Sequence, residues 1–290
     1  MELQKIYTQI KDGKNVREFD NIPDILTARD EDGNTLLHLA ILDENLYTSE
    51  KLLEEGAYPF IYNENGMTFF SLLVQGGAEN LLETVLRCYP NSLTSHEKAE
   101  LLATAAVAGQ SMELKLMIEF GFDVETDYRG ESIISWALQS KCVEIIKLLH
   151  SCGAPIDRAD EAGMTPLYKA SSEGLVDIVE YLIEIGSNIN YSSDSGCTPL
   201  IIACLYKQEG VVRKLLEFGA DTMQKDSDGK TVLDYAKEIG YNEIIDLLSS
   251  DDNLKVHKPT TTKQEEDYKE SSTQTKDILT YDTNSNVKMN

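Results

Sequence analysis

The sequence contains few basic residues and no long apolar run. Its 290 residues include 26 Lys and Arg against 50 Asp and Glu, which gives a formal net charge of −24 at pH 7. Each phosphate contact to a nucleic acid requires a Lys or Arg, so this balance argues against nucleic-acid binding, and it equally disfavours binding to anionic membrane surfaces. No stretch approaches the roughly 20 apolar residues that a membrane-spanning helix requires. We therefore expect neither a nucleic acid as partner nor insertion into a membrane.

A secretory signal and paired cysteines are also missing. The first six residues, MELQKI, do not have the basic and then apolar layout of a signal peptide. The five cysteines are scattered, odd in number and without a Cys-x-x-Cys pair. Because free cysteine is among the most buried residue types, we expect these thiols to be reduced and buried, as in the cytosol. The sequence thus predicts a cytoplasmic protein.

Motifs of enzymes and metal sites are absent as well. The chain has no G-x-x-x-x-G-K-[ST] phosphate-binding loop, no H-E-x-x-H and no G-x-S-x-G. The four histidines (His38, His96, His150 and His257) do not pair at metal-ligand spacing. Acid-rich segments such as 30–32 lack the spacing of a calcium-binding loop, and acids at such positions commonly hydrogen-bond to turn backbone. We expect no enzymatic activity, no cofactor and no metal.

What the sequence does contain is a pattern that recurs about every 33 residues. Glycines of short, turn-like segments occur at Gly33, Gly66, Gly130, Gly163, Gly196 and Gly229. Seven positions after each glycine comes a small or apolar residue: Ala40, Leu73, Ala137, Ala170, Ala203 and Ala236. The one wide interval, from Gly66 to Gly130, is close to two periods of the repeat. Such repetition predicts a stack of similar units, each packed on its neighbours, rather than one globular core.

Each part of the best-preserved unit, residues 160–190, has a physical reason. Gly163 lies where a tight turn needs a positive φ. Thr165 and Pro166 indicate a helix start, because the Thr hydroxyl can accept from a free backbone N–H and proline suits the first helical position. A second glycine ends this helix. Apolar residues at helical spacing between 178 and 183 then define a second helix.

This succession of turn, helix and helix, with Thr-Pro-Leu-Tyr-Lys-Ala at 165–170, resembles the ankyrin repeat. The resemblance implies an all-α ankyrin-repeat solenoid of about seven helix–turn–helix repeats joined by short β-hairpin-like loops. The units start near residues 30, 63, 95, 127, 160, 193 and 226. Residues 1–29 then form an N-terminal helical cap and residues 30–250 the repeats. Residues 251–290 have few apolar residues and no period, so we expect a disordered polar tail.

Two units depart from the pattern. In the unit near residue 63, Thr68 is followed by two phenylalanines, and Tyr89 takes the place of the closing glycine. In the unit near residue 95, Lys98 takes the place of the turn glycine. We therefore expect a distorted turn between residues 85 and 100.

Two single residues have structural interpretations. His38 is the only histidine at the position of the family motif's histidine, which in the resembling family hydrogen-bonds to the turn backbone, and we expect the same here. Trp136 is the only tryptophan, and since Trp is highly buried on average we expect it inside the fold rather than at an interface.

A solenoid presents a long concave surface made of hairpin tips and the exposed side of the first helices. The resemblance places the variable positions of that surface around the turn glycine and near the end of the first helix. The candidate protein-binding residues at such positions are Glu64, Asn65, Met67, Tyr128, Arg129, Glu161, Met164, Leu205 and Tyr206. Tyr and Arg are typical energetic anchors of interfaces. We expect a non-enzymatic protein–protein interaction scaffold whose concave acidic face binds a partner protein through a basic segment of that partner. In the alternative interpretation, the acids only keep the array soluble.

A second function is consistent with the composition of the tail. Residues 264–270, Gln-Glu-Glu-Asp-Tyr-Lys-Glu, resemble the glutamate-rich patches near the C-termini of some effectors of intracellular bacteria. On this interpretation the repeats target host proteins and the tail carries an export signal. The protein would then be secreted into a host cell without a classical signal peptide.

Overall fold

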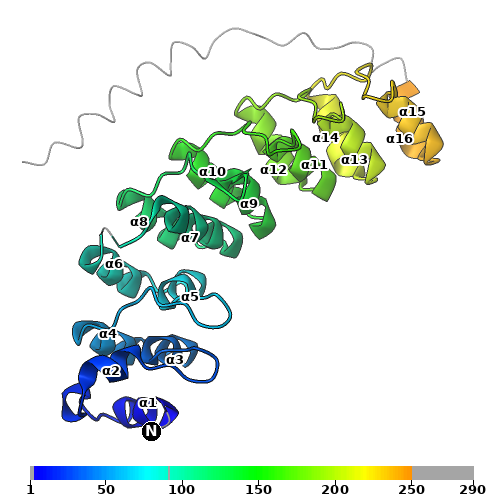
Figure 1. The fold of residues 1–290 in the computed structure, drawn as a ribbon. Helices are drawn as coiled ribbons and strands as arrows, with labels where there is room; N and C mark the ends of the chain where they lie inside the picture. The colour runs from blue at the N-terminus through cyan, green and yellow to red at the C-terminus, as the bar shows by residue number, and fades with distance from the viewer. Residues whose placement is uncertain (1–2, 91, 250–290) are drawn as a thin grey trace, which may run out of the picture. The chain divides into compact units, whose positions relative to one another are not determined.

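The chain folds into pairs of short helices that follow one another in a row (Figure 1). The computed structural model describes residues 3–90 and 92–249, and over these residues there are seven such pairs. The first helices are α3 (Leu36–Leu42), α5 (Phe69–Gly76), α7 (Ser95–Ala108), α9 (Ile133–Ala137), α11 (Pro166–Glu173), α13 (Pro199–Leu205) and α15 (Val232–Glu238). The second helices are α4 (Leu46–Glu54), α6 (Glu79–Cys88), α8 (Ser111–Glu119), α10 (Val143–Ser151), α12 (Val176–Glu184), α14 (Glu209–Glu217) and α16 (Asn242–Ser249). The expected tail, residues 251–290, lies outside the described residues.

Few other elements accompany the pairs. The hairpin before α9 consists of β1 (Asp127–Tyr128) and the antiparallel β2 (Glu131–Ser132), and the 3₁₀ helix η2 (Leu138–Ser140) extends α9. Within the described part of the chain, no helix combines the length and the apolar character that crossing a bilayer requires.

The N-terminal segment closes one end of the row. It contains α1 (Leu3–Lys11), the 3₁₀ helix η1 (Val16–Glu18) and α2 (Ile22–Thr27). Helix α1 buries an apolar side that includes Leu3 and Ile6, and it packs on α3. Its Tyr7 hydroxyl and its Lys11 ammonium both donate to the Asp43 carboxylate, at 2.7 and 2.6 Å. These contacts cover the side of α3 that has no preceding helical pair.

Packing between successive pairs builds the core. Each first helix contacts the next first helix along the row, from α3 to α15, and second helices contact each other likewise from α4 to α14. The small or apolar residues found seven positions after the turn glycines have no exposed surface, among them Ala40, Ala170 and Ala236. A small side chain here lets neighbouring helices approach closely. The all-α repeat solenoid predicted from the sequence is therefore confirmed.

Local chemistry fixes the start and end of each helix. Gly163 has φ +73°, in the left-handed region that its turn requires. The Thr165 hydroxyl accepts from the Tyr168 amide at 3.2 Å, and Pro166 is the first residue of α11. Gly174 ends α11 with φ +74°. All of these features agree with the interpretation of the sequence.

His38 connects two neighbouring units, as well as bonding within its own turn. Its side chain is fully buried, Nδ1 accepts from the Thr35 backbone amide at 3.2 Å, and Nδ1 also lies 2.9 Å from the Thr35 hydroxyl. Nε2 lies 3.0 Å from the Met67 carbonyl oxygen in the next turn. The expected bond to the turn backbone is confirmed, and the second bond ties this unit to its neighbour.

The third pair differs from the others, because the turn before its first helix has no glycine like Gly33 or Gly163; the chain turns there through a hydrogen bond from the Ser92 amide to the Tyr89 carbonyl, at 3.3 Å. Helix α7 begins at Ser95 and extends for 14 residues. Thr94 caps it, accepting from the Glu97 amide at 3.2 Å, while the Glu97 carboxylate accepts from the Thr94 amide at 2.8 Å. Lys98 therefore lies inside the helix and not in a turn. The irregularity expected between residues 85 and 100 is a turn without a glycine, followed by a longer helix.

The cysteines do not all behave as expected. All five are free, and Cys204 is buried, which raises the pKa of its thiol to about 11. Cys88 and Cys152 are exposed, so the expectation of buried thiols is wrong for them. Cys88 is the last residue of α6, and Cys152 directly follows the last residue of α10.

Candidate functional site

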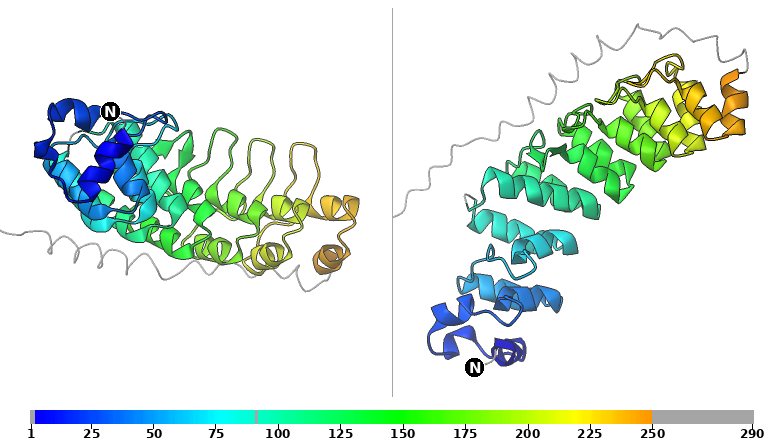
Figure 2. Two further views of the ribbon diagram at one scale, coloured as in Figure 1. Left: turned by 90° about the horizontal axis from the view of Figure 1, so that it is seen from below. Right: turned by 45° about the vertical axis from the view of Figure 1, so that its right-hand side comes forward.

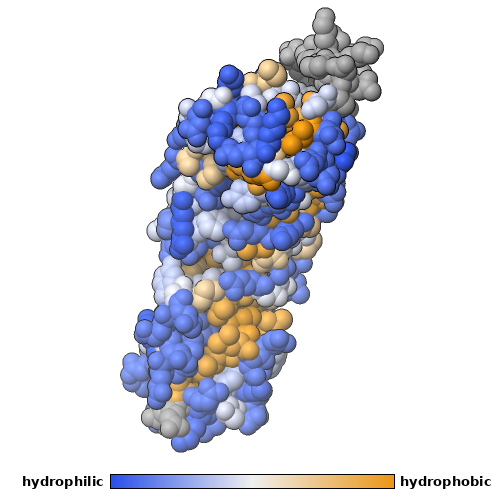
Figure 3. All heavy atoms as spheres, turned by 90° about the vertical axis from the view of Figure 1, so that its right-hand side faces the viewer, coloured by the Kyte–Doolittle hydropathy of each residue, from blue (hydrophilic) through white to orange (hydrophobic). Residues whose placement is uncertain are grey.

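The candidate site is the face formed by the turns and the exposed side of the first helices, here called the first-helix face. From α3 to α13, the first helices lie to the right of the second helices in Figure 1. Figure 3 shows the molecule from that side, and hydrophobic residues gather there among hydrophilic ones. Such a mixture of apolar surface with a polar rim is typical of protein-binding surfaces.

Neighbouring turns stack on one another through backbone hydrogen bonds. In each case an amide of one turn donates to a carbonyl oxygen of the turn before it. These bonds run from Glu64 to Asp32 (2.9 Å), from Asp194 to Ala162 (3.1 Å) and from Ser227 to Ser195 (2.9 Å). The turns of the later pairs stand beside one another in Figure 2 (left). The stacking gives the tips of the turns a fixed spacing along the face.

The first polar residue of most turns holds the turn together. In the best-preserved unit, Asp160 Oδ1 accepts from the amides of Ala162 and Met164 at 2.9 and 3.0 Å. The same pattern occurs at the turns that begin at Asp30, Asn63 and Asp226. These side chains therefore have a structural role. No group of three His, Cys, Asp or Glu residues in 3–90 and 92–249 is arranged to hold a metal ion.

The carboxylates at the turn tips, by contrast, are exposed and form no ion pair with any described residue. They are Glu31, Asp32, Glu64, Glu161, Asp194 and Asp228. Two lysines of the face are already paired with other acids. Lys169 bridges Glu131 and Asp160 at 3.0 and 2.8 Å, and Lys230 pairs with Glu238 at 2.6 Å. The tips therefore present uncompensated negative charge to solvent.

The predicted binding residues lie along this face in four different units and do not converge on one cavity. The exposed members are Glu64, Asn65, Arg129, Glu161 and Tyr206, the last of them 63% exposed at the end of α13. The half-buried members are Met67, Met164 and Leu205. An extended partner segment could contact all of these side chains at once, whereas a small molecule could not.

Tyr128 requires a correction. It was expected to project from the face, but it is only 7% exposed. Its hydroxyl donates to Glu100 Oε1 at 3.1 Å, and its ring lies 5.5 Å from the ring of Trp136. Burial, and next the charge of Glu100, raise the pKa of Tyr128. Tyr128 is therefore a packing residue, while Trp136 is half-buried and donates its indole N–H to the Tyr128 carbonyl at 2.9 Å.

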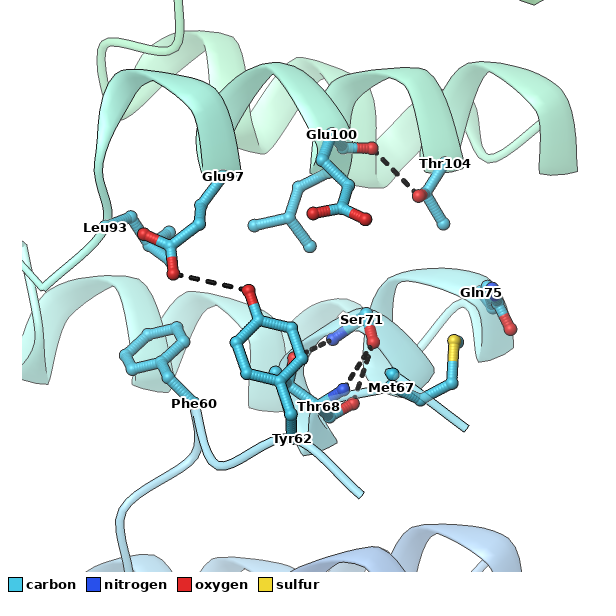
Figure 4. Close-up of a pocket in the computed structure, with 12 residues that line it drawn as sticks. Phe60, Tyr62, Met67, Thr68, Ser71, Gln75, Leu93, Glu97, Glu100 and Thr104 are labelled. Carbon is cyan, nitrogen blue, oxygen red and sulfur yellow. Dashed lines mark hydrogen bonds between the residues drawn. The ribbon is translucent and has the colours of Figure 1, made fainter. Parts of the chain in front are cut away.

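A hollow lies between α5 and α7, where no glycine turn precedes α7. Tyr62 from the preceding turn reaches α7, and its hydroxyl donates to Glu97 Oε1 at 3.3 Å. Figure 4 shows this bond, and it shows the Glu100 carboxylate pointing from α7 toward α5. The hollow has a volume of about 50 Å³, and its floor includes Phe60 and Met67. Acidic and aromatic groups therefore meet where the row of turns is interrupted.

A wider groove continues from this hollow along the face. It lies between α5, α7 and α9, and its volume is about 450 Å³. Ala103, Val107 and Trp136 give it an apolar surface, and Gln75 and Thr104 line both the groove and the hollow. The two together form one continuous concavity of the first-helix face.

Sequence reasoning did not find Tyr62, Glu97 or Glu100. The regular period placed a degenerate turn around Lys98, which hid the helical face of α7. One local signal was available, because Thr94 and Glu97 have the spacing of a capping box. That signal places the helix start at Ser95 and puts Glu97 and Glu100, three residues apart, on one face of the helix.

Comparison with known proteins agrees with this geometry. A sequence model described as ankyrin repeats (3 copies) matches residues 101–193, 143–226 and 186–259, which together span more than half of the chain. An ankyrin repeat protein of fowlpox virus (strain NVSL) is 28% identical over 142 residues, which are 48% of this chain and 32% of that protein. The nuclear factor NF-kappa-B p105 subunit of Gallus gallus is 26% identical over 161 residues, 53% of this chain and 16% of that protein.

The chain thus spans less than a third of the length of each of these relatives. Repeats of the matched family generally mediate protein–protein interactions, and the family is typically a non-enzymatic scaffold. The repeated turns, the buried small residues of the first helices and the matched segments all lead to one conclusion: the chain belongs to the ankyrin repeat family.

Proposed function

We propose that this protein is a non-enzymatic interaction scaffold that binds a partner protein on its concave first-helix face, and that a basic segment of the partner docks there. The observation that carries the proposal is the row of exposed tip carboxylates without ion-pair partners among the described residues. Interface charges of this kind steer association and select partners of opposite sign. We also propose that all seven helical pairs, and not only those after residue 101, act as repeats of one binding surface.

Apolar contacts would supply most of the affinity. Tyr206 is 63% exposed, and an exposed tyrosine can bury a large area with little loss of side-chain entropy. Leu205 is half-buried next to Tyr206, and Met67 and Met164 are half-buried in turns that carry the exposed Glu64 and Glu161. A partner segment that carries both basic and apolar residues fits this alternation, because each of its side-chain types then meets a complementary group.

The experiment is affinity capture followed by a salt titration. The full chain is immobilised, bound proteins are identified, and the dissociation constant of the purified partner is measured between about 0.1 M and about 1 M salt. Over this range the Debye length falls from about 10 Å to about 3 Å. We expect binding to weaken steeply with salt. An affinity that does not change with salt would remove the electrostatic part of the proposal.

A charge-matched pair of variants locates the effect. Glu64→Gln with Glu161→Gln removes two tip carboxylates, whereas Glu119→Gln with Glu184→Gln removes two exposed carboxylates from the second helices α8 and α12. Both double variants have the same net charge. We expect only the first to weaken binding and to reduce its salt dependence.

The second candidate function is that of an effector that is exported into a host cell. It is supported by the acidic run at 264–270 in the sequence, which lies outside the described residues. A translocation assay of the full chain against a chain lacking residues 251–290 tests it. Delivery that persists without the tail would contradict an export signal there, and a cytoplasmic location would then be the proposal.

A further inference from the structure

We propose that the hollow between α5 and α7 receives a cationic side chain from the partner's basic segment. This inference rests on the proposed function, because it names the group of the partner that one position of the face binds. The site is built by the interruption of the row of turns before α7, and it combines two carboxylates with aromatic walls in a narrow space.

The two carboxylates have free acceptor capacity. Glu97 Oε2 accepts from the amide and the hydroxyl of Thr94, both at 2.8 Å, so Glu97 is held in place. Among the described residues, only the Tyr62 hydroxyl donates to its Oε1, at 3.3 Å. Glu100 uses Oε1 for the Tyr128 hydroxyl, and its Oε2 accepts no hydrogen bond from a described residue. A cation entering here would find acceptors that are already oriented.

The negative charge of the hollow favours binding of a cation. Glu97 and Glu100 are three residues apart on α7, so their charges lie side by side and repel each other. Neither forms an ion pair with a described residue. The Thr94 amide, which donates to Glu97, lowers the pKa of that carboxyl, so it is ionised at neutral pH. A bound ammonium or guanidinium group would relieve this repulsion.

Aromatic rings lie near the two acids and also attract a cation. Tyr62 and Phe60 line the hollow, and Tyr128 borders it through its bond to Glu100. Cations are attracted to the faces of such rings. The guanidinium carbon of Arg129 already lies 5.1 Å from the centre of the Tyr128 ring. Arg129 approaches from the following hairpin, and it forms no ion pair with Glu97 or Glu100 among the described residues.

The size of the hollow limits what can enter. About 50 Å³ is room for the end of one long side chain, since a water molecule takes up about 30 Å³ in the liquid. The methylene stem of a lysine or arginine would lie along apolar surface such as Leu93 and Leu101 while its charged end reaches the acids.

The test uses hexalysine as the probe and the full chain as the protein. Binding is followed at low salt by the fluorescence of Trp136, the only tryptophan, which lines the adjoining groove. The variant is Glu97→Gln with Glu100→Gln. Gln keeps an acceptor for the Thr94 amide and for the Tyr128 hydroxyl, so we expect the fold and its melting temperature to be retained.

The control is Glu119→Gln with Glu184→Gln, which changes the net charge by the same amount on the second helices. We expect the dissociation constant of hexalysine to rise about five- to tenfold in the Glu97 and Glu100 variant and less than about twofold in the control. Equal weakening in both variants, or no binding of hexalysine to the wild type, would overturn the inference.

The same two variants are then measured against the captured partner, which separates this inference from the proposed function. A partner whose binding depends on Glu64 and Glu161 but not on Glu97 and Glu100 contradicts the inference and leaves the proposed function standing. A partner indifferent to all four carboxylates contradicts both.

Discussion

Gly196 lies directly against the backbone of Ser227 in the following turn. A β-carbon at Gly196 would be 2.7 Å from the Ser227 nitrogen, closer than such atoms can approach. The same crowding occurs where Gly33 meets Glu64 and where Gly163 meets Asp194. Each of these glycines therefore meets two separate requirements, a positive φ within its own turn and space for the next turn to stack.

Gly66 and Gly229 meet only the first requirement. The unit after Gly66 has no turn glycine, and Gly229 belongs to the last glycine turn of the row. A β-carbon at either position would have no atom within 4 Å. Their φ angles of +71° and +75° are close to the +78° of Gly196. Gly66→Ala and Gly229→Ala should cost about 1 to 2 kcal/mol in the free energy of unfolding, the strain of a left-handed alanine.

Gly196→Ala should cost more, about 3 kcal/mol or above, because the stacked turn must also move. Urea unfolding of the three single variants measures the difference. Equal losses at Gly196 and Gly66 would show that stacking of the turns contributes nothing to stability.

Replacement of His38 should make stability less dependent on pH. Burial lowers the pKa of His38, so the folded state keeps it neutral while the unfolded chain takes up a proton below its ordinary value of about 6.5. The stability that His38 contributes is therefore complete above about pH 6.5 and declines as the pH falls toward its folded-state pKa.

His38→Gln should cost about 2 to 3 kcal/mol near pH 7.5, because the bond to the Met67 carbonyl is lost inside the core. The cost should shrink near pH 5.5. Urea unfolding of both proteins at the two pH values measures it. The difference between the two proteins isolates the contribution of His38, and parallel pH profiles would contradict a buried neutral His38.

Gln208 should be coupled energetically to Gly174. Its side-chain amide donates to the Ser172 carbonyl at the end of α11, at 3.0 Å, and its Oε1 lies where a β-carbon on Gly174 would be. Gln208→Ala should cost about 1 kcal/mol for the lost bond. Gly174→Ala should cost less in the Gln208→Ala background than in the wild type, by about 0.5 kcal/mol or more.

A double-mutant cycle by chemical unfolding gives this coupling. Gly186→Ala is the matched control, since Gly186 also has a positive φ, +99°, but would meet no atom within 4 Å. Its cost should add to that of Gln208→Ala. Additive costs at Gly174 would mean that the side chain of Gln208 moves aside freely.

Truncation of Tyr128 should lower the stability of the fold much more than truncation of Tyr206. Tyr128→Ala removes a buried ring and the bond to Glu100, so we expect a loss of about 3 to 4 kcal/mol in the free energy of unfolding. Tyr206→Ala removes a side chain that is mostly in solvent and should change stability by less than about 0.5 kcal/mol. Thermal unfolding of the two variants decides; a stable Tyr128→Ala protein would return Tyr128 to the set of binding candidates.

The repeat, its helices and its turns could be predicted from the sequence because local chemistry determines them. Gly163, Thr165 and Pro166 act within a few residues of their own positions, and the apolar spacing of α12 defines its buried side. Tyr128 could not be predicted in this way. Tyr128 lies two residues before its turn glycine, as the exposed Glu161 does. The unit that precedes Tyr128 has no turn glycine, however, and the side chain of Tyr128 packs toward α7.

The hollow beside α7 has the same origin. Whether Glu97 and Glu100 face solvent or a neighbouring turn depends on a contact between units, which the period alone does not encode. The predicted binding residues follow from position within one unit, and apart from Tyr128 they are exposed or half-buried.

Hydroxyl-radical footprinting of the complex with the captured partner tests most directly which face binds. Tyr206 on the first-helix face and Tyr47 on the second helix α4 are matched reporters, 63% and 70% exposed, and Met164 and Met112 form a second pair. We expect the partner to protect Tyr206 and Met164 from oxidation and to leave Tyr47 and Met112 as reactive as in the free protein. Protection of Tyr47 and Met112, with Tyr206 and Met164 unchanged, would contradict binding on the first-helix face.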